Sequence, residues 1–90
     1  MTDATRAELM DALLEYRSAH DELTRACKVW AAEAVICVVD GIGGGARRDG
    51  IAAVVARRDA EQRWIKACDR FDRARMACAR EQLAETEPTP

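Results

Sequence analysis

Residues 40–46 read Asp-Gly-Ile-Gly-Gly-Gly-Ala, and this stretch decides the fold because a long helix cannot continue through it without a large cost. Glycine loses more conformational freedom on folding than any other residue, so the four glycines within positions 41–45 predict a turn. Proline, the other strong helix breaker, occurs only at positions 88 and 90. The sequence therefore divides into two long helix-forming halves joined by one turn.

The first half carries a heptad pattern from Asp3 to Asp40. One row contains Leu9, Tyr16, Leu23, Trp30 and Cys37, and a second row contains Leu13, His20, Cys27 and Ala34. Alternating spacings of three and four residues over four heptads are typical of a coiled-coil seam. We therefore expect a helix over about 3–40 that presents these two rows to a partner helix.

The second half repeats an alanine every seven residues. One row contains Ala53, Ala60, Ala67 and Ala74, and the other row contains Trp64, Phe71 and Cys78, with Arg57 as its exception. Alanine and arginine, with 18 and 12 copies in the chain, are among the best helix formers. We therefore expect a second helix over about 47–84.

The two seams can be docked against each other. Reversal of the chain around residue 45 would pair residues whose numbers sum to about 90, which sets Trp30 against Ala60 and His20 against Phe71. Large residues then meet small ones almost throughout, as a packed helix pair requires. The predicted fold class is all-α, an antiparallel two-helix hairpin that is coiled-coil-like with an Ala-rich seam. It forms one domain over residues 1–83, followed by a disordered tail over 84–90.

One hairpin leaves apolar residues uncovered, mainly near the turn where the first helix is apolar on nearly every side. These residues predict a dimer or partner interface: Val35, Ile36, Val38, Val39, Ile51, Val54, Val55, Ile65 and Met76. A helix that is hydrophobic all round is normally buried, and two helices cannot bury each other completely. The simplest solution is a homodimer in which two hairpins form a four-helix bundle.

Charge is distributed unevenly along the chain. The formal net charge is −2, but residues 1–40 carry eight acids and four bases, whereas residues 46–80 carry five acids and ten bases. Opposite signs favour pairing of the two halves with each other. The basic residues also form a candidate charged partner face: Arg58, Arg63, Lys66, Arg70 and Arg73. Acids interleave them, so nucleic acid is an unlikely partner and another protein is favoured.

The residue types needed for catalysis or for a cofactor are not grouped in the sequence. His20 is the single histidine and has no serine, aspartate or cysteine arranged with it as a catalytic set. No cysteine or histidine lies within four residues of another, whereas zinc sites use such close pairs. We therefore predict that the chain is not an enzyme and binds no cofactor or metal.

Two alternative functions remain open. The first is an anion or nucleotide site at the turn, formed by backbone amides and two arginines: Gly43, Gly44, Gly45, Arg47 and Arg48. The second is a cysteine-based redox or metal function, because the spacings Cys27 to Cys37 and Cys68 to Cys78 resemble the twin Cys-x9-Cys pattern of coiled-coil-helix proteins. That family forms two disulfides across its hairpin, but in the predicted register Cys37 faces residue 53 and not Cys68.

No signal peptide or membrane span is expected, because residues 1–10 are polar and the longest apolar run is only six residues, 34–39. A cytoplasmic location follows, in which thiols stay reduced. The alanine and arginine bias is typical of high-GC bacterial or phage genomes. We therefore predict a non-enzymatic protein–protein interaction module, a small phage or bacterial regulator or inhibitor that binds a host protein complex.

Overall fold

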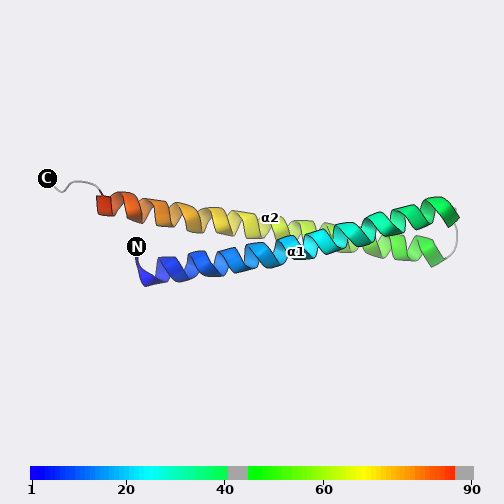
Figure 1. The fold of residues 1–90 in the computed structure, drawn as a ribbon, viewed down its shortest axis with the longest axis horizontal. Helices are drawn as coiled ribbons and strands as arrows, with labels where there is room; N and C mark the ends of the chain where they lie inside the picture. Colours follow the sequence, from blue (N-terminus) through cyan, green and yellow to red (C-terminus); the bar gives the residue numbers. More distant parts are fainter. Residues whose placement is uncertain (41–44, 87–90) are drawn as a thin grey trace.

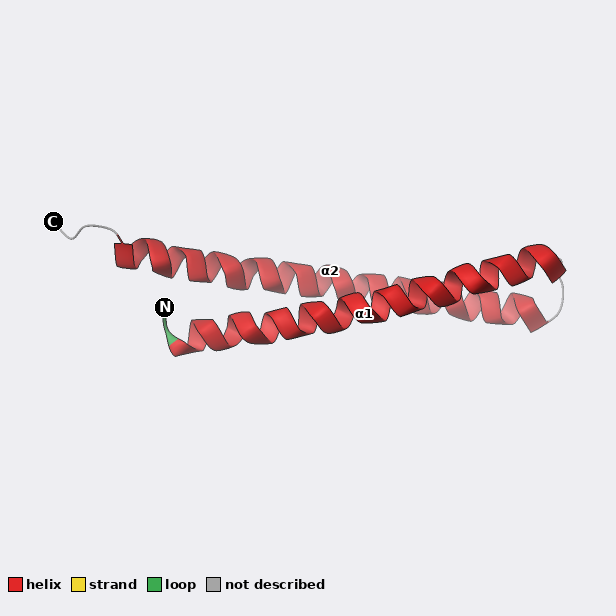
Figure 2. Cartoon of the chain, viewed as in Figure 1, coloured by secondary structure: helices red, strands yellow, loops and turns green. Residues whose placement is uncertain are grey.

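Two long antiparallel helices make up the computed structural model, which describes residues 1–40 and 45–86 (Figure 1, Figure 2). Helix α1 spans Asp3–Asp40 and helix α2 spans Gly45–Thr86, and no strand is present in these two ranges. The predicted all-α hairpin is confirmed. Both helices pack side by side along their length, in a molecule with extents of 73 × 18 × 13 Å.

The helix ends differ slightly from the predicted ones. Helix α2 begins two residues before the expected start at 47, and it continues through Thr86, so positions 84–86 are helical where a disordered tail was expected. The turn residues 41–44 and the tail residues 87–90 lie outside the described residues, as do the side chains of 37–40 and 45–49. Neither of the two described helices is long and apolar enough to cross a bilayer.

Thr2 caps the start of α1. Its hydroxyl oxygen accepts a hydrogen bond from the backbone N–H of Thr5 at 3.1 Å, and its carbonyl oxygen accepts one from the N–H of Arg6 at 3.1 Å. The first contact satisfies an amide that has no partner inside the helix, and the second is the first backbone bond of the helix. Asp3 adds a negative charge in the first turn, where the helix dipole favours it.

The seam between the helices is made of small residues. The buried hydrophobic side chains are Ala12 and Ala19 in α1, and Ala53, Ala60, Ala67, Ala74 and Cys78 in α2. Alanine has little volume, so two helices that meet through alanine rows can approach closely. No large side chain is fully buried among the described residues. The larger residues lie along the edges of the seam, where they are only half-buried.

The predicted register is wrong, because the residues that meet across the seam lie three to seven positions earlier in α2 than expected. His20 lies against Trp64, with ring centroids 5.1 Å apart, and not against Phe71. Tyr16 contacts both Trp64 and Phe71, with centroids 4.6 and 5.2 Å apart, although Ala74 was expected opposite it. In the observed register the Tyr16 ring contacts two other aromatic rings, a contact that alanine opposite it could not provide.

Helix α1 is also rotated relative to the predicted docking. The row of Ala12 and Ala19 is buried in the seam, whereas His20, Cys27 and Ala34, which were expected there, are exposed. An alanine row of α1 therefore packs near the alanine row of α2. This arrangement brings the helix axes closer than a row of histidine and cysteine would allow.

Candidate protein-interaction surface

An apolar patch surrounds the turn end of the hairpin. We call residues 29–36 of α1 and 50–56 of α2 the turn-end patch; these fifteen residues contain one charged side chain, Glu33. Among the described side chains twelve large hydrophobic ones are exposed, and seven belong to the patch: Val29, Trp30, Val35, Ile36, Ile51, Val54 and Val55. Val35 is 63% exposed and Ile51 is 58% exposed. Exposed apolar residues gathered in this way usually mark a contact surface.

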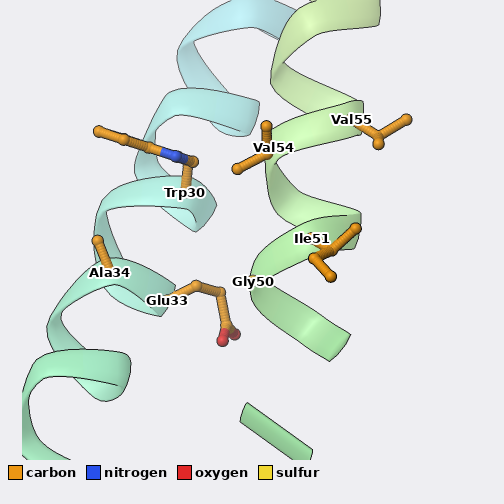
Figure 3. Close-up of a pocket in the computed structure, with 7 residues that line it drawn as sticks. All are labelled: Trp30, Glu33, Ala34, Gly50, Ile51, Val54 and Val55. Carbon is orange, nitrogen blue, oxygen red and sulfur yellow. The ribbon is translucent and has the colours of Figure 1, made fainter. Parts of the chain in front are cut away.

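A groove of about 350 Å³ runs between the helices within this patch. It is lined by Trp30, Glu33, Ala34, Gly50, Ile51, Val54 and Val55. Figure 3 shows Val54 pointing toward α1, Val55 pointing away from it, and the side chain of Glu33 directed toward α2. Gly50 contributes no side chain, which leaves space between the helices at this level. The groove is therefore an apolar depression with a single carboxylate in it.

Arg57 occupies the seam at the inner boundary of the patch. Its guanidinium carbon lies 4.5 Å from the centroid of the Trp30 ring, which is a cation–π contact. The Nε atom of Arg57 is buried and has no hydrogen-bond partner among the described residues. A buried donor without a partner is costly, so this position is incompletely satisfied in the isolated hairpin.

One flank of the hairpin is closed by ion pairs. Arg63 binds Glu15, with Nε and Oε1 3.1 Å apart, and it also pairs with Glu22. Arg70 binds Glu8 at 2.9 Å and Asp11 at 3.6 Å. We call Glu8, Glu15, Glu22, Arg63 and Arg70 the ion-pair flank. The cross-helix attraction expected from the charge distribution is thus realised on this side.

These contacts shift the titration of the groups involved. The hydrogen bond from Arg70 holds the pKa of Glu8 below its ordinary value of 4.5. Hydrogen bonds to Glu15 and Glu22 raise the pKa of Arg63. The pKa of Glu81 is lowered because it accepts hydrogen bonds from the Thr5 hydroxyl at 2.5 Å and from the Thr2 amide at 2.9 Å. The half of the hairpin far from the turn is therefore the polar half.

The opposite side, which we call the open flank, carries no such pairs. It comprises Leu13, His20, Cys27 and Ala34 of α1 and Val54, Glu61, Cys68 and Arg75 of α2. Helical spacing places this α1 row three residues before Tyr16, Leu23 and Trp30, and hence beside that row. Among the described residues, Arg75 of this flank pairs with Asp72 of the same helix, at 3.9 Å.

The predicted interface residues fall into three groups. Val35, Ile36, Ile51, Val54 and Val55 come together in the turn-end patch. Ile65 and Met76 are exposed but lie farther along α2, outside the patch. The side chains of Val38 and Val39 lie outside the described residues. Sequence reasoning omitted Glu33 and Gly50, although a single acid within an apolar run was a usable signal for the first.

The predicted charged face is split by the structure. Arg63 and Arg70 are engaged across the hairpin, whereas Arg58, Lys66 and Arg73 are exposed. The candidate anion site cannot be placed, because residues 43 and 44 and the side chains of Arg47 and Arg48 lie outside the described residues. Its remaining member, Gly45, begins α2.

The described cysteines are free thiols. Cys27 is exposed, Cys68 is half-buried, and Cys78 is buried with its thiol donating to the sulfur of Met1 at 3.5 Å. Burial raises the pKa of the Cys68 thiol, and the charges of Asp72 and Asp69 add to this effect. Within the described side chains, no three metal-ligating groups gather in one place.

Compared with known proteins, the chain matches no protein family, and neither curated proteins nor solved structures give a significant match.

Proposed function

We propose that this chain is a non-enzymatic interaction module that forms a homodimer, a four-helix bundle of two hairpins, and binds another protein in that form. The observation that carries the proposal is the composition of the core. Six alanines and one cysteine are the buried hydrophobic residues, and no large side chain is fully buried among the described residues. Such a core contributes little hydrophobic stabilisation, and small domains with insufficient cores are commonly completed by association.

The exposed area of the hairpin supports association. The chain exposes 6881 Å², whereas a compact monomer of 9.9 kDa is expected to expose about 5,200 Å². The radius of gyration is 20.4 Å, against roughly 12 Å for a compact domain of 90 residues. The excess of about 1,700 Å² per chain is ample for a stable protein–protein interface.

A second copy is the favoured occupant of the turn-end patch. The patch is nearly free of charge, and obligate homodimer interfaces are the most apolar class of protein interface. Two copies of the same patch would cover each other without stranding charged groups, apart from Glu33. A separate protein target would then meet the remaining, polar surface of the bundle.

The charge of that remaining surface indicates the kind of target. Arg58, Lys66 and Arg73 are exposed on α2, whereas Arg63 and Arg70 already bind acids of α1. Exposed bases without cross-helix partners among the described residues favour an acidic surface on another protein. A role as a small regulator or inhibitor in a bacterial or phage cytoplasm remains our prediction for the context.

The solution mass tests the self-association directly. Light scattering after size exclusion, with and without reductant, is expected to give about twice the 9.9 kDa of the chain in both conditions. A dimer that separates on reduction would instead assign the association to the cysteines. A monomer in both conditions at all accessible concentrations would contradict the proposal.

A further inference from the structure

We infer that the second copy packs on the open flank of the hairpin, with the two turns at the same end of the bundle. This inference rests on the proposed homodimer and adds which face is used and how the two copies are oriented. It follows from the rows of α1, from the positions of the aromatic rings, and from the distribution of charge along the flank.

Helix α1 has three adjacent rows of mainly apolar residues, although a two-helix seam needs only two. The first contains Ala12, Ala19 and Ala26, the second contains Leu9, Tyr16, Leu23 and Trp30, and the third contains Leu13, His20, Cys27 and Ala34. A stripe of three rows is typical of a helix that packs against more than one neighbour in a bundle. Within the hairpin α2 covers the first two rows, and His20, Cys27 and Ala34 of the third remain exposed.

The aromatic residues lie in rows that border this same flank. Tyr16 and Trp30 border it on α1, and Trp64 and Phe71 border it on α2. The rings of Tyr16, Trp64 and Phe71 contact one another but are only half-buried, and Trp30 is 37% exposed. Aromatic side chains gain most when their large area is removed from water. A second hairpin on the open flank would cover all four rings together.

The ion-pair flank offers no comparable place for a second hairpin. Arg63 and Arg70 already bind Glu8, Glu15 and Glu22 across it. Packing another copy there would remove these charges from water with no new partners, which is unfavourable. The turn-end groove also continues the open flank, since Ala34 and Val54 line the groove and belong to the flank.

The orientation follows from how polarity changes along the open flank. Its turn half carries Cys27, Ala34 and Val54, Glu61 lies near its middle, and its other half carries Arg75. If the turns lie at the same end, the apolar turn halves of the two copies meet each other around a two-fold axis along the bundle. If they lie at opposite ends, the groove of each copy meets the arginine-bearing half of the other. Two separate copies expose about 5,100 Å² more than a compact protein of their combined mass, which is ample for a stable interface.

Two matched substitutions test the face. Ala34 and Ala7 are both exposed on α1, but Ala34 is on the open flank, whereas Ala7 shares the row of Asp21 and Lys28 on the back of the helix and lies outside the turn-end patch. We expect Ala34→Glu to weaken dimerisation by about 100-fold or more, because a two-fold interface would bury two unpaired carboxylates. Ala7→Glu should leave the dimer intact. Circular dichroism is expected to show the same helix content for both variants.

The outcomes separate this inference from the proposed function. A wild-type dimer that Ala34→Glu does not weaken more than Ala7→Glu would overturn the assigned face and leave the homodimer standing. A monomeric wild-type chain would overturn both. If Ala34→Glu loses helix content, the dimer is tested by the distance between labels, which needs only the smaller substitution Ala34→Cys.

A distance between labels tests the orientation. The variant carries Ala34→Cys with a nitroxide label, in a background where Cys27, Cys37 and Cys68 are alanine and the buried Cys78 is retained. With the turns at the same end, the two labels are expected within roughly 25 Å, because helices in a bundle lie about 8–10 Å apart. With the turns at opposite ends, the rise of about 1.5 Å per residue separates the two positions by roughly 35–40 Å. The longer distance would overturn the inference.

Discussion

Replacing Ala60 by leucine tests how closely the two helices approach. Ala60 is 1% exposed and lies in the alanine row of the seam. Leucine adds three carbon atoms at a place where the neighbouring helix leaves no space, and overpacking of this kind costs about 1–3 kcal/mol. A domain of this length has a free energy of unfolding of roughly 5–13 kcal/mol, so we expect a loss that is a substantial part of the total.

The measurement is urea unfolding followed by circular dichroism, with all variants at one protein concentration because the stability of a dimer depends on it. Ala79→Leu is the matched control, because Ala79 is exposed on α2 and its replacement changes helix propensity by only a few tenths of a kcal/mol. If Ala60→Leu unfolds within about 0.5 kcal/mol of Ala79→Leu, the close approach of the helices through alanine is refuted.

Two further predictions concern titratable groups. Cys68 should react with iodoacetamide at neutral pH more slowly than the same thiol in the urea-unfolded chain, because its raised pKa lowers the fraction of thiolate. Asp72→Asn should speed the reaction. Peptide mass spectrometry measures the rates, and equal rates in folded and unfolded chains would contradict the prediction. The lowered pKa values of Glu8 and Glu81 stabilise the fold above their ordinary value of 4.5, and this contribution is lost as the pH falls from 4.5 through their folded-state values. Thermal unfolding should therefore show less acid dependence for Glu81→Gln than for Asp21→Asn, an exposed acid on the back of α1.

The hairpin itself could be predicted because its signals are local. Four glycines within five positions end the first helix whatever surrounds them, and the alanine row from Ala53 to Ala74 identifies the buried face of α2. Both features depend on the chemistry of single segments. The fold class was therefore accessible from composition and spacing alone.

The register was not accessible in the same way, because a heptad pattern repeats. Sliding one helix by seven residues moves His20 from Phe71 to Trp64 and keeps each heptad row opposite the same row of the other helix. Matching of rows therefore cannot distinguish registers that differ by a whole heptad. The observed register is the one in which Tyr16 meets Trp64 and Phe71, and such specific contacts are not visible in a repeating pattern.

The prediction of which α1 rows face α2 was wrong for a related reason. Three apolar rows were present, and the sequence does not state which two face α2. The turn-end patch was recovered because its residues are apolar on every side, which does not depend on rotation. The groove was not predicted, because Glu33 and Gly50 meet across the two helices only for one rotation of α1 and one register of the helix pair.

The hairpin keeps the start of α1 and the end of α2 together and far from the turn. Met1 pairs with Glu85, so the start of α1 lies beside the end of α2 (Figure 1). The 38 residues of α1 separate this end from the turn by about 57 Å at the usual helical rise. A tag, an immobilising linker or a fused domain on either terminus would therefore stand at the opposite pole from the turn-end patch. The molecule could therefore be anchored at this end without covering the surface that we assign to the second copy.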